Sequence, residues 1–269
     1  MTPTATFDSQ PSRQTRRQAL RLGLRMAGTG LLATLGTGLS APVLAATASG
    51  DARLAMLAFD AHYIPPLFLT GSAPKSEAGP AKARAALQRL VDGWPSHRRA
   101  LAAAVPAQAD WLRALDAVQG LLERATAQVA ANDWAGSHET LEHVREALFK
   151  ARRALGIDYT LDAYTAYHGA MEVLANATTI DQGAFTADLA QARRLWRELE
   201  ALPFDAAAHG LDAARSAQLV QARQDEAAAL ARLEQALAAQ APDAELLKAA
   251  AALKPPFIRA YLSFGAPMP

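Results

Sequence analysis

Cysteine is absent from the 269-residue sequence. The chain therefore has no disulfide, and it cannot build a thiolate zinc site, an iron–sulfur cluster or a covalently attached Cys-x-x-Cys-His haem. Any metal ion that it binds must be held by nitrogen and oxygen ligands.

The sequence also lacks the signals of β-structure. No segment alternates apolar and polar residues over a strand length, valine and isoleucine are not enriched, and Asn-Gly hairpin turns are missing. Alanine, leucine, arginine, glutamate and glutamine dominate instead, and these residues favour helix. The sequence predicts an all-α protein, and the short loops between its helices predict an up-down helical bundle.

Familiar catalytic motifs are missing as well. There is no Gly-x-Ser-x-Gly nucleophile elbow, no phosphate-binding glycine loop and no dinucleotide fingerprint. His138-Glu-Thr-Leu-Glu-His143 differs from the zinc-peptidase motif, because its second histidine is five residues after the first and so lies about 140° around a helix. A non-enzymatic role is favoured.

The first 48 residues are distinct from the rest of the chain. Thr15-Arg-Arg-Gln-Ala-Leu-Arg21 precedes a weakly apolar run from Met26 to Leu39 and small residues at Ala46-Thr-Ala48. This order resembles the twin-arginine export signal of bacteria, with Ala19 where that family usually has phenylalanine. The resemblance implies export of the folded chain by the twin-arginine machinery, removal of residues 1–48, a periplasmic location and no stable membrane span after cleavage.

The basic character of the whole sequence comes from this segment. Removing residues 1–48 leaves 22 of the 27 lysine and arginine residues and 25 of the 26 acidic residues. That mildly acidic balance gives no support for nucleic-acid binding. About 220 residues remain, which are enough for a substantial core.

Two helical regions are predicted after the signal. Residues 49–180 are expected to form a helical bundle that carries the candidate site, and residues 181–269 a second, degenerate half. The basis is a loose repeat: Lys254-Pro-Pro-Phe-Ile-Arg-Ala-Tyr-Leu-Ser-Phe-Gly265 is similar to Ile64-Pro-Pro-Leu-Phe-Leu-Thr-Gly71. It suggests two diverged four-helix bundles packed together, of which the second lacks the histidines of the first.

Apolar residues at helical spacing divide the chain into successive helices. Pro65-Pro66 is expected to end the first helix, and Gly93 with Pro95 is expected to interrupt the second. Gly156 marks a helix end, after which Asp158 or Thr160 caps the next helix. The predicted ranges are 51–63, 81–101, 107–131, 134–155, about 160–176, 185–202, 211–240 and 243–253.

Two similar pairs of residues lie on consecutive predicted helices. His138 and Glu142 are four residues apart, as are His168 and Glu172, so each pair shares one face of its helix. His168 falls inside an apolar stripe, where an unpaired imidazole is costly. The short loop between the helices predicts antiparallel neighbours, with Glu142 level with Glu172 and Arg145 level with His168.

A divalent metal ion would explain this arrangement. Glu142, His168 and Glu172 form the core of a predicted site for iron, manganese or zinc, because oxygen ligands with one imidazole suit those ions. Asp60 on the first helix, and His138 at about 12 Å from His168 along the axis, are further candidate ligands. Three other residues are predicted to surround the ligands: Arg145, Tyr63 and Tyr164.

Another interpretation of the same residues needs no metal. Glu142 pairs with Arg145 or Arg152, and Glu172 pairs with His168, so that the cluster is a buried ion-pair network that fixes helix register. The protein is then a helical scaffold that docks a periplasmic partner protein.

Other cofactors are also considered. Di-iron carboxylate bundles pair glutamate and histidine on facing helices, but their Glu-x-x-His spacing is missing here, so the similarity extends to architecture alone. Non-covalent haem b is a lesser alternative, with His168 or His138 as one axial ligand and Met56 or Met171 as the other.

Overall fold

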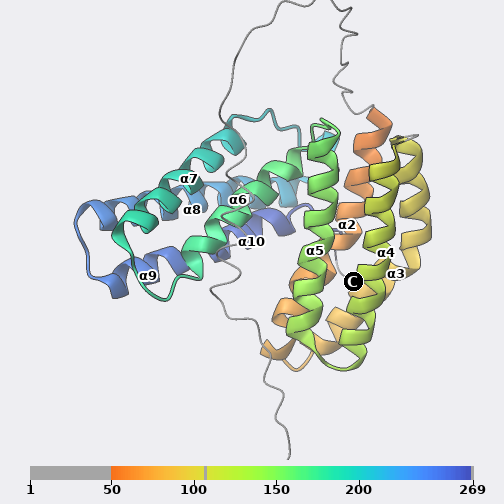
Figure 1. The fold of residues 1–269 in the computed structure, drawn as a ribbon, viewed down its shortest axis with the longest axis horizontal. Helices are drawn as coiled ribbons and strands as arrows, with labels where there is room; N and C mark the ends of the chain where they lie inside the picture. The colour runs from red at the N-terminus through yellow and green to blue at the C-terminus, as the bar shows by residue number, and fades with distance from the viewer. Residues whose placement is uncertain (1–49, 106–107, 268–269) are drawn as a thin grey trace, which may run out of the picture. The chain divides into compact units, whose positions relative to one another are not determined.

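In the computed structural model, which describes residues 50–105 and 108–267, every regular element is a helix (Figure 1). The all-α prediction is therefore confirmed for this part of the chain, whereas the predicted export signal lies outside it. None of the helices within it combines the length and the apolar character needed to cross a membrane. The elements are α2 (Gly50–Ser72), η1 (Ala73–Lys75), α3 (Gly79–Ala104), α4 (Ala109–Ala130), α5 (Trp134–Ala154), α6 (Thr160–Ala175), α7 (Gln182–Ala201), η2 (Ala207–His209), α8 (Ala213–Ala238), α9 (Asp243–Ala251) and α10 (Lys254–Leu262).

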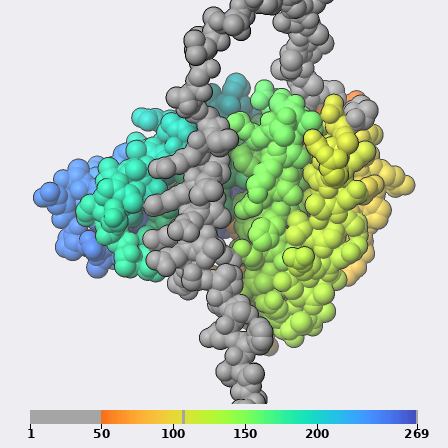
Figure 2. All heavy atoms as spheres, in the orientation of Figure 1, coloured from red at the N-terminus to blue at the C-terminus, as the bar shows by residue number. Residues whose placement is uncertain are grey.

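Helices α2 to α5 form a four-helix bundle. They lie side by side in Figure 1, where α2 contacts α3 and α5, and α4 contacts the same two helices. Each helix turns an apolar stripe inward; on α4 the stripe includes Trp111, Leu115 and Val118, all of which are buried. Trp111 also donates from Nε1 to the Leu101 carbonyl at 2.8 Å, which ties the start of α4 to α3. In the space-filling view, side chains of α4 and α5 form a continuous surface (Figure 2).

The helices from α6 onward form a second group. α6 packs against α7, α9 and α10, and α8 packs against the same three helices. The two groups meet where α10 contacts α2 and where α5 contacts α6. α6 is inclined to α5 and does not run along it (Figure 1), so the two helices meet over a short stretch. The predicted division into residues 49–180 and 181–269, and the duplication behind it, stay predictions.

The prediction that Pro65-Pro66 ends the first helix is wrong. α2 continues to Ser72 with both prolines inside it. A proline lacks the N–H group that would bond to the carbonyl four residues earlier, so Pro65 leaves the Ala61 carbonyl without its helical donor. The Ala266 N–H donates to that carbonyl at 2.7 Å. The C-terminal segment thus replaces the bond that the proline removes.

The second predicted interruption is also wrong, because α3 runs through Gly93 and Pro95 to Ala104. The carbonyl that Pro95 leaves without a helical donor belongs to Val91, which is partly exposed. The second Pro-Pro pair breaks no helical hydrogen bond at Pro255. Pro255 lies in the first turn of α10, where a backbone N–H has no intrahelical partner.

The turn between α5 and α6 agrees with the sequence in part. Gly156 has a φ of 65°, the left-handed conformation that glycine adopts after a helix, as predicted. The cap of α6 was predicted wrongly, since Tyr159 occupies that position in extended backbone and makes no side-chain cap bond. Neither Asp158 nor Thr160 caps the helix, because the Tyr159 side chain is drawn into a buried polar group described below.

Candidate functional site

Arg145 is the central residue of the candidate site. α5 places Glu142 and Arg145 on adjoining turns, and only 4% of the Arg145 side chain is exposed. Its guanidinium contacts the Glu142 carboxylate and donates from Nη2 to Nδ1 of His168 at 2.6 Å. The Tyr261 ring centre lies 5.6 Å from the guanidinium carbon, which adds a cation–π contact. Arg145 therefore joins α5 to α6 and α10.

The contacts continue on both sides of Arg145. On α5, the His138 Nε2 lies 3.9 Å from a Glu142 carboxylate oxygen. On α6, the His168 Nε2 lies 3.7 Å from a Glu172 carboxylate oxygen. Lys254, the first residue of α10, pairs with Glu172 at 2.8 Å. We call this connected set the charge network; its members are His138, Glu142, Arg145, His168, Glu172 and Lys254.

The network is anchored to α2 as well. The His138 ring donates from Nδ1 to the Leu67 carbonyl at 2.8 Å. Gly71 gives that ring room, because a Cβ at Gly71 would lie 3.1 Å from the His138 Nδ1. The hydroxyl of the buried Tyr63 donates to the Leu141 carbonyl at 2.6 Å. These contacts hold α5 against α2 beside the network.

The charges of the network are balanced. Burial, followed by the Arg145 charge, lowers the pKa of His168 well below its usual value, so the imidazole is neutral and its Nδ1 accepts from the guanidinium. Burial raises the pKa of Glu142, and the Arg145 charge opposes that rise. Burial also acts against the charge of Arg145, but Glu142 and nearby tyrosines outweigh it and raise the Arg145 pKa. Two carboxylates, Glu142 and Glu172, thus face two cations, Arg145 and Lys254.

A second buried polar group lies where α5 turns into α6. Arg152 donates from Nε to both carboxylate oxygens of Asp162 at 3.0 and 2.9 Å, and from Nη2 at 2.5 Å. Its guanidinium carbon lies 4.7 Å from the Tyr159 ring centre, and the Tyr159 hydroxyl donates to Asp60 at 2.6 Å. Burial raises the pKa of Asp60 to about 6, although the Arg152 charge opposes the rise. We call these four residues the Arg152 group.

The structure brings together part of the residue set predicted from sequence. Arg145 and His168 are in contact, as their nearly equal distances from the turn predicted. The predicted pairings of Glu142 with Arg145 and of Glu172 with His168 are both present. Asp60, the further candidate ligand on α2, accepts a hydrogen bond from the Tyr159 hydroxyl, and the Arg145 charge also acts on its carboxylate.

Tyr164 is buried beside Tyr261, the aromatic residue that contacts Arg145. Its ring centre is 6.1 Å from that of Tyr261, and its hydroxyl has no hydrogen-bond partner among the residues that the structure describes. Burial raises the Tyr164 pKa to about 12. The candidate haem ligands Met56 and Met171 are both buried in the core, and the haem b hypothesis stays a prediction.

The metal hypothesis also stays a prediction. Within residues 50–105 and 108–267, no three histidine, cysteine or acidic side chains are grouped so that they could hold one ion. Glu142 is engaged by Arg145, and Glu172 is engaged by Lys254. A divalent ion bound by Glu142, Glu172 and His168 would have to displace the guanidinium that now joins Glu142 to His168.

Sequence reasoning missed two members of the site and one buried acid outside it. Lys254 and Tyr261 come from α10, which the sequence presented only as a repeat of an apolar segment. Glu226 on α8 is fully buried, and it could have been found, because it follows Leu219 and Ala222 at helical spacing.

Glu226 forms a separate buried acid site. The Tyr167 hydroxyl donates to its Oε1, while its Oε2 has no partner within the described part of the chain. Burial raises the pKa of Glu226 to about 8, although the hydrogen bond from Tyr167 opposes the rise. The carboxyl group is therefore neutral in mildly acidic solution and becomes charged inside the core as the pH rises.

We expect Glu226→Gln to flatten the pH dependence of stability. The pKa of Glu226 is raised on folding from 4.5 to about 8, so its contribution is fully present below pH 4.5 and is lost as the pH rises through about 8. Between about pH 6 and pH 8 that loss amounts to roughly 2 kcal/mol, at about 1.4 kcal/mol for each pKa unit. Urea unfolding at several pH values measures it, with Glu123→Gln on the exposed face of α4 as control. Parallel pH profiles for wild type and Glu226→Gln would contradict the expectation.

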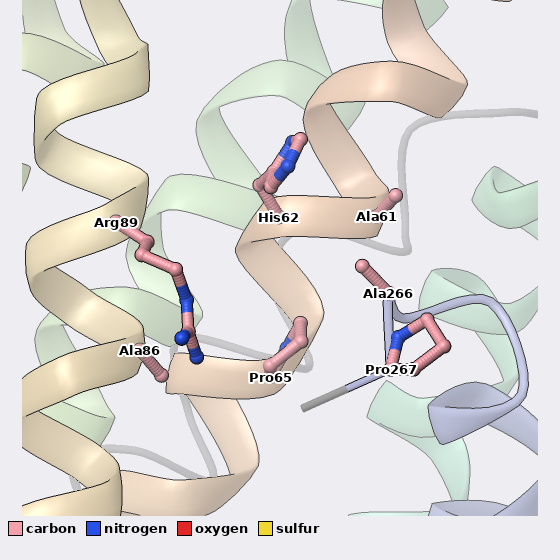
Figure 3. Close-up of a pocket in the computed structure, with 7 residues that line it drawn as sticks. All are labelled: Ala61, His62, Pro65, Ala86, Arg89, Ala266 and Pro267. Carbon is pink, nitrogen blue, oxygen red and sulfur yellow. The ribbon is translucent and has the colours of Figure 1, made fainter. Parts of the chain in front are cut away.

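A shallow pocket lies between α2, α3 and the C-terminal segment (Figure 3). Figure 3 shows the Arg89 guanidinium directed toward Pro65 and the His62 ring pointing to the opposite side. The lining offers no carboxylate and no nucleophile. It consists of Ala61, His62, Pro65, Ala86, Arg89, Ala266 and Pro267.

No protein-family model, curated protein or solved structure matches this chain. Its function must therefore be inferred from its own residues and contacts.

Proposed function

We propose that this protein is an exported, non-enzymatic helical scaffold of the bacterial periplasm that docks a partner protein. The observation that carries the proposal is the position of Arg145 between Glu142 and His168, where one buried guanidinium joins three helices. The export signal at Thr15-Arg-Arg17 supports the periplasmic location. No nucleic acid is expected among the partners, because the exported chain is mildly acidic.

Charge balance supports a structural role for the network. Each of its two carboxylates already has a cation, and His168 is neutral. A metal centre for a divalent ion generally leaves its carboxylates uncompensated until the ion binds. Buried ion pairs of this kind add little net stability, but a shifted helix register would leave a charge without its partner. The network thus favours one arrangement of α5, α6 and α10 over its alternatives.

Metal binding is the second candidate function, with iron, manganese or zinc as the ion. One observation favours it. Burial is the largest cause that raises the pKa of Glu142, and Arg145 and His138 oppose the rise, but the charge of Glu172 adds to it. The two carboxylates are therefore close enough to repel each other, and a divalent ion would relieve that repulsion. The His168 Nε2 lies 3.7 Å from a carboxylate oxygen of Glu172.

Glu172→Ala separates the two functions. The scaffold proposal expects no bound metal in protein purified from the periplasm. It also expects that adding Fe²⁺, Mn²⁺ or Zn²⁺ shifts the melting temperature of the variant by as much as it shifts that of wild type. Because the side chains of Glu172 and Lys254 are 35% and 34% exposed, the metal-free variant should lose about 1 kcal/mol of stability, and not the 3–5 kcal/mol of a fully buried pair.

The control for this experiment is Glu123→Ala on the exposed face of α4. A metal-dependent rise in melting temperature that Glu172→Ala abolishes and Glu123→Ala preserves would overturn the scaffold proposal in favour of metal binding, because an ion stabilises only the state that binds it. A rise that survives Glu172→Ala would come from another place on the protein and would leave the network as a structural element.

A further inference from the structure

Two histidines from neighbouring helices face each other outside the charge network. His62 on α2 and His97 on α3 have ring centres 5.0 Å apart, with their planes inclined by 47°. α2 and α3 pack against each other, so the separation of the two rings is set by helices and not by a loop. Imidazole is the commonest metal ligand among side chains, and two of them at this separation are within reach of one ion.

The hydrogen bond of His62 leaves its Nε2 available to a metal ion. Its Nδ1 donates to the Ala58 carbonyl one turn earlier, at 3.0 Å, so the proton is on Nδ1 and the lone pair is on Nε2. Metal-binding histidines commonly use their second nitrogen in this way, because a bond to a backbone carbonyl orients the ring. His62 is exposed, so an ion can approach it from solvent.

His97 is held by packing in place of hydrogen bonds. Its ring meets the Phe59 ring edge-on at 5.9 Å between centres. A Cβ at Gly93 would lie 3.3 Å from the His97 Nε2, so the absence of a side chain at Gly93 lets the ring pack against α3.

The nearby charged groups are occupied or directed elsewhere. Arg98 pairs with Asp116 of α4 at 2.5 Å, and Asp92 accepts a hydrogen bond from Gln88 at 2.7 Å. The Arg89 guanidinium is directed toward Pro65, away from the His62 ring (Figure 3). Among the described residues no third histidine, cysteine or acidic side chain completes a site here, so water would fill the other coordination positions.

We propose that His62 and His97 bind one divalent transition-metal ion at the surface between α2 and α3. Two imidazoles with water suit Cu²⁺ and Ni²⁺, and Cu²⁺ binds most tightly in the series of first-row divalent ions. This site is separate from the charge network and does not depend on the scaffold function proposed above.

A titration of the full chain with Cu²⁺, followed by equilibrium dialysis, tests the proposal. His62→Ala and His97→Ala should each weaken the tightest copper binding by at least about tenfold, as expected for loss of one of two protein ligands. The matched control is His143→Ala, which removes an exposed imidazole beside Glu139 of its own helix and should leave the affinity unchanged. Electron paramagnetic resonance should report two nitrogen ligands in wild type and one in each of the two variants.

Gly93→Ala adds a test in which both histidines are kept. The new Cβ would push the His97 ring by a few tenths of an ångström, so copper binding should weaken several-fold. Equal copper affinity of wild type and the double variant His62→Ala/His97→Ala would overturn the proposal. Copper binding that Glu172→Ala abolishes and His62→Ala preserves would overturn it too, by placing the ion at the charge network.

Discussion

Arg145→Met is expected to lower the free energy of unfolding by about 3 kcal/mol. Methionine keeps much of the apolar stem, but it removes the guanidinium that pairs with Glu142 and donates to the His168 Nδ1. A buried carboxylate that loses its partner typically costs 3–5 kcal/mol. The lower end applies because burial already raises the pKa of Glu142, so that this group can escape part of the cost by taking up a proton. Chemical unfolding in urea measures the change.

Two further variants show whether lost charge pairing causes the effect. Arg113→Met on the exposed face of α4 changes the same residue type at a side chain that is 70% exposed, and it should stay within about 0.5 kcal/mol of wild type. Adding Glu142→Gln to Arg145→Met should recover roughly 1 kcal/mol, because the stranded carboxylate is gone. No recovery in the double variant would mean that Arg145 acts through packing against Tyr261 and not through its charge.

The fold was predictable because helical periodicity is a local property. The stripe on α4, for example, is visible from the spacing of Trp111, Leu115 and Val118, and each of them is buried. The errors at Pro65 and Pro95 have a non-local origin. The donor that replaces the lost bond at the Ala61 carbonyl is the Ala266 N–H, which is about 200 residues away in the chain, and no local rule can supply it.

The contacts of the candidate site were likewise predictable where they depend on local spacing, and unpredictable where they depend on the packing of distant helices. The contact between Arg145 and His168 followed from helix rise and a short turn, both of which can be read from sequence. Lys254 and Tyr261 reach the network only because α10 packs against α2 and α6, which no spacing rule reveals. The inclination of α6 to α5 was not predictable either (Figure 1).

Two arginines on one side of α5 determine where that helix meets α6. Arg145 contacts His168, and Arg152, two turns later, binds Asp162. Both contacts link residues that are nearly equidistant from Gly156 in the sequence. The contact nearer the turn is the better satisfied of the two, because Arg152 makes several charge-assisted bonds whereas the Arg145 Nε and Nη1 have no hydrogen-bond partner among the described residues. The Arg152 pair should therefore show the stronger energetic coupling.

We expect Arg152→Met and Asp162→Asn each to lower the free energy of unfolding by about 3–5 kcal/mol. Their side chains are only 5% and 9% exposed, so either change leaves the charge of the remaining partner buried, without a counter-charge and with little access to water. Arg152→Met also removes the cation over the Tyr159 ring, so it should be the more costly of the two. Urea unfolding of both single variants and of the double variant measures the coupling.

The double variant should be less destabilised than the sum of the two single variants by about 2 kcal/mol, because removing both charges leaves neither stranded. Arg113→Met and Asp158→Asn are the matched controls, since they make the same changes at exposed positions outside the pair and should each stay within about 0.5 kcal/mol of wild type. Single-variant losses that add to within about 0.5 kcal/mol would show that the pair is not coupled. The turn between α5 and α6 would then be fixed by apolar packing around Ile157 and Leu161, and not by the ion pair.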